Sequence, residues 1–286
     1  MNGIVIVDKP QDWTSQDVVS KLRGVFQTRR IGHGGTLDPM ATGVLPVFVG
    51  RATRGVEFFE HAEKTYEATI RLGIATDTED ITGTVLEEKS ANISEEEFLD
   101  ILEQFRGDIQ QIPPMYSALK INGQKLCDLA RKGKEVERQP RTITIHKLEC
   151  LEFDRNTARL LVHCSKGTYI RTLCKDIGEA LGCGGCMASL RRVSAGSYTI
   201  AEAIPLKELV ESEDAGKYLR GVDTMFAEYP AITLTANQEK RCRNGNSFSV
   251  TLESGTYRAY SQAGEFLMLA QVADGIMSTK MSFFEV

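Results

Sequence analysis

A glycine-rich loop near the N-terminus holds the aspartate with the clearest potential for chemistry. Residues 32–39 read GHGGTLDP, which places Asp38 after three glycines and directly before a proline. Proline disfavours helical torsions at the residue before it, and glycines let the backbone approach another chain closely. The pattern predicts a carboxylate at a rigid, exposed turn and makes Asp38 a candidate catalytic residue. An Asp-Pro pair is also an ordinary turn, and His33 can equally be a local hydrogen-bonding residue, so the residues alone leave both interpretations open.

The sequence motifs of nucleotide and metal chemistry are missing. The chain has no Walker A motif, no GxGxxG after a strand and no HExxH. Cys183 and Cys186 have the spacing of half a zinc site, but no second pair of ligands stands near them in the sequence. We therefore expect neither a cofactor nor a metal ion.

The elements expected around the Asp38 loop begin with a buried strand and a helix. Residues 3–7 form an apolar run that stops at Asp8, Lys9 and Pro10. A capping box at residues 14–17 predicts a helix that ends before Arg29. Five glycines and two prolines within residues 31–50 exclude a regular helix and predict a long ordered loop that leads into a strand.

The middle of the chain shows alternating and helical patterns. Residues 64–72 alternate as a half-buried strand does, and a capping box at Ser94 predicts a helix that ends near Gly107. Residues 142–153 and 158–164 predict two strands paired around a turn at 154–156, and residues 168–181 predict a helix. After Tyr229 and Pro230 the pattern changes to short strands, which predicts a large domain at 1–229 and a small β-barrel-like module at 230–286.

Composition and charge describe a globular chain with an uneven surface. The 286 residues are 42% hydrophobic and carry a net charge of −5. Residues 57–112 have a net charge of −11, whereas residues 1–56 and 120–147 have net charges of +3 and +5. A basic face for a polyanion is therefore possible, although such runs can also be solvated surface. No run approaches the roughly 20 apolar residues of a membrane span, and seven scattered cysteines suit free thiols in a reducing cytoplasm.

Six sequence blocks, in one order from residue 8 to residue 192, resemble the TruB-type tRNA pseudouridine synthases. The block around Asp38 reads GHGGTLDPMATGVLP and is similar to the family's motif around its catalytic aspartate. The other blocks read DKP with TS at 14–15, KTYEA, PPMYSALK, SKGTYIRTL and LRR. Two departures stand out: Gly34 replaces the family's usual threonine, and residues 183–187 lack the Ala-His-Leu often found before the LRR block.

The resemblance implies a role for each matching residue. Asp38 would be the nucleophile, and the sequence leaves open whether it attacks C1′ or assists formation of a glycal-type intermediate. Arg171 would pair with Asp38, and Tyr66 would stack on the base and help remove its C5 proton. Other matches imply that Tyr169 and Leu190 line the uridine pocket, that His33 packs against the extruded nucleotide and that Lys9 supports the site. Without the motif, Tyr66 and Leu190 can be core residues and Arg171 a solvated helix residue.

The resemblance also implies a fold, a substrate and a setting. The expected fold is α+β, with a largely antiparallel sheet flanked by helices and a PUA-type RNA-binding module at the C-terminus. The expected reaction is the isomerisation of uridine 55 in the T-arm of tRNA, by a cytoplasmic monomer without a small-molecule cofactor. A noncatalytic tRNA-binding or folding chaperone on the same fold is the alternative. A metal-dependent RNA hydrolase is a further rival, which activity in the presence of EDTA would exclude.

Overall fold

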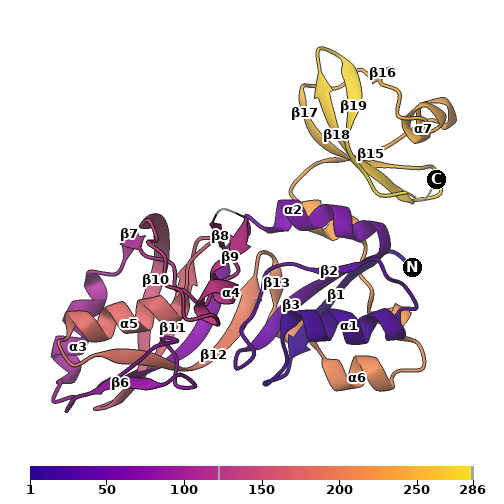
Figure 1. Ribbon diagram of the computed structural model, residues 1–286. Helices are drawn as coiled ribbons and strands as arrows, with labels where there is room; N and C mark the ends of the chain where they lie inside the picture. The colour runs from indigo at the N-terminus through magenta and orange to yellow at the C-terminus, as the bar shows by residue number, and fades with distance from the viewer. Residues whose placement is uncertain (122, 285–286) are drawn as a thin grey trace. The chain divides into compact units, whose positions relative to one another are not determined.

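The computed structural model describes residues 1–121 and 123–284 (Figure 1). Contacts divide the chain into two compact units. The first unit consists of Met1–Pro39, Leu45–Glu60 and Ala201–Val286, and the second consists of Met40–Val44 and His61–Ile200. The chain therefore passes between the units four times, and the passage between Pro39 and Met40 comes one residue after Asp38.

The first unit contains the N-terminal strand and helix that the sequence predicted. Its strands follow the order β14-β1-β3, β2 pairs with β3, and the four buried residues Ile4–Val7 of β1 are at most 1% exposed. Helix α1 begins after Thr14, whose side chain accepts from the backbone of Asp17 at 3.0 Å while the Asp17 carboxylate accepts from the Thr14 backbone at 2.9 Å. These elements are β1 (Gly3–Lys9), α1 (Ser15–Val25), β2 (Ile31–His33), β3 (Thr42–Val49), whose first three residues belong to the second unit, η1 (Gly50–Gly55), α2 (Val56–Phe59), β14 (Ile204–Pro205), α6 (Leu206–Glu211), η3 (Ala215–Tyr218) and η4 (Val222–Phe226).

The second unit is built on an antiparallel sheet with the order β12-β4-β11-β10-β7. Helix α5 contacts β4 and β12, helix α3 contacts β10, and the two helices contact each other. Burial alternates residue by residue along β4, as the sequence predicted. The elements are β4 (Lys64–Leu72), β5 (Ile74–Thr76), β6 (Val85–Glu88), α3 (Glu95–Glu103), β7 (Gly107–Gln111), β8 (Lys120–Ile121), β9 (Gln124–Lys125), α4 (Leu126–Ala130), β10 (Arg141–Asp154), β11 (Thr157–Cys164), α5 (Ile170–Ala180), β12 (Gly185–Ala195), β13 (Tyr198–Thr199) and η2, whose residues Ile200–Glu202 end the unit and begin the next segment.

The last part of the chain forms a separate curled sheet with its own core. Its strands follow the order β15-β17-β18-β19-β16, and Leu234, Leu267 and Met268 are among its buried residues (Figure 1). The elements are β15 (Ala231–Thr233), α7 (Ala236–Arg243), β16 (Phe248–Ser249), β17 (Gly255–Tyr260), β18 (Phe266–Ala273) and β19 (Ile276–Ser282). Contacts group this sheet with the first unit; for example, the Phe226 ring lies 5.8 Å from that of Phe283. The division between residues 229 and 230 stays a prediction.

The mixed fold, with a largely antiparallel large sheet and a small C-terminal sheet, confirms the predicted fold class. One central element was not predicted. Strand β12 pairs with β4 over most of its length and also runs parallel to the start of β3, where Arg191 and Arg192 lie opposite Thr42 and Gly43. Within residues 1–121 and 123–284, no helix has the length and apolar character needed to cross a membrane.

Candidate active site

The peptide before Asp38 is held by a buried serine of helix α1. The Leu37 N–H donates to Ser15 Oγ at 2.8 Å, and the Ser15 hydroxyl lies 3.3 Å from the Leu37 carbonyl oxygen, to which it donates. Ser15 is 2% exposed and Leu37 is 3% exposed, so water does not compete for these groups. A single hydroxyl therefore engages both polar groups of the residue that precedes Asp38.

The residue after Asp38 is held by a buried lysine. The Lys9 ammonium donates to the carbonyl oxygens of Pro10, Trp13 and Pro39 at 2.8, 2.5 and 3.2 Å. The Pro39 carbonyl also accepts from the Asp12 N–H at 2.8 Å. Because a buried ammonium needs acceptors for its protons, these carbonyls compensate for its removal from water. The partly exposed Asp38 thus lies in a segment that is tied on both sides.

Two phenylalanines fill the space beside Gly34, one of the two places where the sequence departs from the resembling family. A Cβ atom at Gly34 would lie 2.5 Å from Phe59 Cδ1 and 3.0 Å from Phe48 Cε2. The two rings contact each other edge to face at 5.8 Å between centroids. The predicted site residue His33 is the last residue of β2 and pairs with Val47 of β3. A side chain at residue 34 would therefore force the Phe59 ring to move.

The other predicted site residues lie in the second unit, and Arg171 is buried there at the start of helix α5. Arg171 is 5% exposed. Its guanidinium donates to the Thr78 carbonyl at 3.0 Å and to the Tyr116 carbonyl at 2.8 Å. The turn that contains Thr78 is itself ordered, because one carboxylate oxygen of Asp80 accepts from the Thr78 hydroxyl at 3.0 Å and from the Thr82 N–H at 2.9 Å. Arg171 is therefore part of a fixed structure and is not a solvated helix residue.

Tyr66 and Leu190 share one face of the sheet in the second unit. Tyr66 of β4 pairs with Arg192 of β12, and Leu190 pairs with Ala68. Paired residues of antiparallel strands point to the same face, so Tyr66 and Leu190 are diagonal neighbours on that face. Tyr66 is 9% exposed and Leu190 is 8% exposed. The register thus brings these two predicted pocket residues together.

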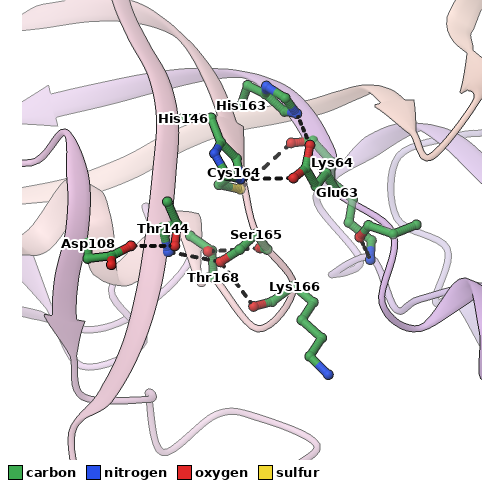
Figure 2. Close-up of polar contacts among 11 residues, drawn as sticks. Glu63, Lys64, Asp108, Thr144, His146, His163, Cys164, Ser165, Lys166 and Thr168 are labelled. Atoms are coloured by element: carbon green, nitrogen blue, oxygen red, sulfur yellow. Dashed lines mark hydrogen bonds and ion pairs between the residues drawn. The ribbon is translucent and has the colours of Figure 1, made fainter.

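The loop before Tyr169 is fastened to strand β10 of the sheet (Figure 2). Thr144 of β10 exchanges two hydrogen bonds with Ser165, each 2.9 Å long, from the Thr144 N–H to Ser165 Oγ and from the Ser165 N–H to the Thr144 carbonyl. The Thr144 hydroxyl donates to Asp108 of β7 at 2.6 Å. The Thr168 hydroxyl closes the loop by donating to the Ser165 carbonyl at 3.0 Å. These bonds fix the path of the chain into Tyr169 and Arg171.

A carboxylate shared by two histidines lies beside this loop, and the sequence reasoning missed it (Figure 2). Glu63 Oε1 lies 3.0 Å from His146 Nε2, and Glu63 Oε2 lies 2.9 Å from His163 Nε2. The two imidazole rings are 5.0 Å apart. His146 is the extra residue of a β-bulge between Ile145 and Lys147, and bulges commonly re-aim a side chain. Two histidines on paired strands are a signal for such a contact, but a regular pairing of the two strands would not bring these two together, whereas the bulged pairing does.

Burial shifts the ionisation of several groups in the second unit. It raises the pKa of Asp176 on α5 to about 6, and the neighbouring Lys175 only partly opposes this effect. Burial likewise raises the pKa of the Cys164 and Cys186 thiols to about 11, so these cysteines are protonated at neutral pH. All seven cysteines are free thiols. Over the part of the chain that the structure describes, no three His, Cys, Asp or Glu side chains are arranged to hold a metal ion.

Comparison with known proteins gives one consistent family. Residues 23–170 match the TruB family pseudouridylate synthase N-terminal domain, and residues 171–223 match the tRNA pseudouridylate synthase B C-terminal domain. A tRNA pseudouridine synthase B of Clostridium kluyveri is 41% identical over 280 residues, which cover 96% of each chain. Its counterpart in Haemophilus influenzae is 43% identical over 276 residues, with 93% of this chain and 88% of the relative covered.

Solved structures show the same fold at lower identity. A Cbf5-Nop10-Gar1 complex contains a chain that matches with a TM-score of 0.74 at 24% identity, over 99% of this chain and 85% of that one. An H/ACA RNP bound to a substrate RNA that contains 2′-deoxyuridine matches with a TM-score of 0.73 at 22% identity, over the same shares of the two chains.

Proposed function

Because the chain belongs to the TruB family of pseudouridylate synthases, we propose that it isomerises uridine to pseudouridine at position 55 in the T-arm of tRNA. The observation that carries the proposal is the match to curated tRNA pseudouridine synthases over nearly the whole chain, at 41–43% identity. The intact Asp38 loop, tied by Ser15 and Lys9, supplies the carboxylate that the reaction requires. The chain is an isomerase, and the tRNA arm and the nucleotide position are the specific parts of the proposal.

The reaction exchanges one bond to the ribose for another. The N1–C1′ glycosidic bond breaks, the base turns, and a C5–C1′ bond forms; C5 then loses its proton, and N1 carries one in the product. No atom is gained or lost overall, so the balance requires no oxidant, reductant or co-substrate. Asp38 serves either as the nucleophile at C1′ or as the group that assists elimination to a glycal-type intermediate.

The other site residues act on the carboxylate or on the base. Arg171 pairs with Asp38, since an adjacent cation favours the ionised form of a carboxylate. Tyr66 stacks on the base and assists loss of the C5 proton. The stacking contact is worth about 1–3 kcal/mol, by analogy with other contacts between bases and aromatic side chains. Tyr169 and Leu190 line the uridine pocket, and His33 packs against the extruded nucleotide. Lys9 supports the Asp38 turn, a role that its three hydrogen bonds to backbone carbonyls favour.

The target uridine must leave the base stack of the tRNA arm before it can react. Extrusion of a base from a folded arm costs a few kcal/mol, which contacts in the pocket and along the phosphates must return. The basic segments 1–56 and 120–147 would hold the phosphates, so binding should weaken as salt concentration rises. We further propose that the protein acts as a monomer in the cytoplasm, where tRNA is modified, and that residues 230–286 form an RNA-binding module.

Tritium release from a tRNA transcript labelled at C5 of uridine tests the proposal. The wild-type protein should release tritium, and Asp38→Asn should release none while it binds the transcript within several-fold of the wild type. Asp12→Asn is the matched control: Asp12 is exposed in the adjacent turn at φ 64°, a conformation that asparagine tolerates well. Normal release by Asp38→Asn would refute the assignment of the nucleophile. A folded wild-type protein that binds the transcript without release would refute the reaction and favour a tRNA chaperone.

A further inference from the structure

A buried glutamine at the end of strand β7 holds the backbone of Tyr169 by both of its polar groups. The Tyr169 N–H donates to Gln111 Oε1 at 2.8 Å, and Gln111 Nε2 donates to the Tyr169 carbonyl oxygen at 3.1 Å. Gln111 is 2% exposed, so these bonds are shielded from water. A primary amide carries a donor and an acceptor side by side, and this arrangement matches the two backbone groups of one residue.

Helix α5 needs this partner because it lacks the usual cap. Tyr169 is the N-cap residue of α5, and its own side chain makes no capping hydrogen bond. The Tyr169 carbonyl also accepts the first helical bond, from the Leu173 N–H at 3.0 Å. The first N–H groups of a helix, in contrast, have no acceptor within the helix and must find one elsewhere. Gln111, from a strand 58 residues earlier in the sequence, supplies an acceptor for one of these groups, the N–H of Tyr169, and thereby holds the residue at which the first turn begins.

The same stretch of chain also reaches Arg171. Five residues after Gln111, the Tyr116 carbonyl accepts from the Arg171 guanidinium at 2.8 Å. The segment between them contains Pro113 and Pro114, which restrict its backbone. The Pro113 carbonyl is itself engaged by Arg138 at 3.3 Å. One short, stiff segment therefore contacts the helix at the residue expected to line the uridine pocket and at the arginine expected to serve the nucleophile.

We propose that Gln111 is a positioning residue for the isomerisation, through the two hydrogen bonds that orient Tyr169 and the start of α5. This inference rests on the proposed function, because Tyr169 and Arg171 take their catalytic meaning from it. Gln111 itself touches no reacting atom, and its loss should slow the chemical step more than it weakens tRNA binding.

Two substitutions separate positioning from general stabilisation. Gln111→Met preserves the length of the side chain and removes both hydrogen bonds. Gln111→Glu keeps the acceptor for the Tyr169 N–H, but its carboxylate places a second oxygen against the Tyr169 carbonyl. When that carboxyl is protonated, its O–H can donate to the Tyr169 carbonyl and restore both bonds. The matched control is Gln110→Glu, which makes the same change one residue earlier, at an exposed side chain that donates to Thr142 Oγ1 at 2.8 Å.

Charged groups on the surrounding elements influence the new carboxyl. Asp108 lies on β7, Arg141 is the register partner of Gln111 on β10, Arg138 contacts the following segment and Arg171 lies on α5. The three arginines favour the ionised form and the aspartate opposes it, while burial and the facing carbonyl favour the protonated form. The pH series is therefore run in parallel on the wild type and on Gln110→Glu, so that changes common to all proteins cancel.

Single-turnover tritium release under saturating enzyme measures the effect. Gln111→Met should be slower than the wild type by about tenfold or more at every pH. This change corresponds to an activation free energy that is higher by at least ~1.4 kcal/mol. Gln111→Glu should be as slow at pH 8 and should approach the wild type as the pH falls towards 5.5. Both variants should bind the transcript within about threefold of the wild type. A normal rate for Gln111→Met, or a deficit of Gln111→Glu that does not change with pH, would overturn the proposal.

Amide hydrogen exchange of the free protein gives a readout that does not depend on activity. Loss of the Gln111 acceptor should accelerate exchange of the Tyr169 amide by about tenfold or more in Gln111→Met and leave it unchanged in Gln110→Glu. Unchanged exchange at Tyr169 in Gln111→Met would overturn the positioning role, even if the wild-type protein proved inactive. Inactivity of the wild type with accelerated exchange in the variant would instead refute the proposed function and support the contact.

Discussion

Removal of the Ser15 hydroxyl should loosen the turn that carries Asp38. Ser15→Ala leaves the Leu37 N–H without its acceptor at 2.8 Å, in surroundings where Leu37 is 3% exposed. An unsatisfied buried donor costs about 1–3 kcal/mol, and the longer 3.3 Å bond to the Leu37 carbonyl adds little. We expect a loss of about 2 kcal/mol in the free energy of unfolding, or about 4 °C in Tm for a chain of this size.

The same substitution should also slow catalysis, because Leu37 is the residue bonded to Asp38. A carboxylate displaced by a fraction of an ångström can cost about 10- to 100-fold in rate. Differential scanning calorimetry and single-turnover tritium release measure the two effects, and Ser20→Ala on the exposed side of α1 is the control. A change in Tm below 1 °C would refute the proposed bond energy. A lowered Tm with a normal single-turnover rate would show that Ser15 stabilises the fold without positioning Asp38.

Three further predictions concern other buried positions. Burial raises the pKa of Asp176 from 3.8 to about 6, so the folded state binds this proton more tightly than the unfolded state, and wild-type stability falls as the pH rises through that window. Asp176→Asn should therefore raise Tm at pH 7.5 and lose this advantage at pH 4, as thermal melts at the two pH values will show. Gly43 has φ 102°, and an added Cβ would lie 2.2 Å from the Arg192 carbonyl oxygen, so Gly43→Ala should lower the urea midpoint strongly; a change within error would contradict this contact. Gly34→Thr should destabilise the protein because Phe59 fills that space, and addition of Phe59→Leu should recover part of the loss in a double-mutant cycle, whereas additive effects would argue against steric coupling.

Elements with a strong local signal were predictable from the sequence. The capping boxes at Thr14 and Ser94 start α1 and α3, and the alternation of residues 64–72 matches the buried and half-buried positions of β4. Strand β12 was missed because Arg191 and Arg192 interrupt its apolar pattern, although Arg192 is 1% exposed and donates to the Val44 carbonyl at 2.6 Å. A buried arginine with a backbone acceptor cannot be distinguished from a surface arginine by residue type alone.

The sequence predicted only those site residues that lie within the family motifs. The resemblance named Asp38, Tyr66 and Arg171, whose catalytic roles stay predictions. It did not name Gln111, because its partner is the backbone of Tyr169 and backbone groups leave no trace in a sequence pattern.

The register between strands β10 and β11 was a second feature that the sequence did not predict. A regular hairpin from the pair Asp154 and Thr157 would place His163 opposite Leu148, away from His146. One bulge in β10, at Leu151, shifts the register so that His163 pairs with Lys147. A second bulge leaves His146, the neighbour of Lys147, as an extra residue, and its ring lies 5.0 Å from that of His163. Bulges change which side chains meet, and the sequence of a strand does not reveal them reliably.

The four passages of the chain between the units have a consequence for folding during synthesis. Residues 61–200 of the second unit emerge as one continuous segment, but β1 of the first unit has to wait for its neighbour β14, which pairs Val7 with Ile204. At about 5–20 residues per second the ribosome needs roughly 10–40 s to make the intervening 200 residues. During that time the apolar run Ile4–Val7 lacks this edge of its sheet. The unit that carries Asp38 therefore depends on the last third of the sequence to complete its sheet.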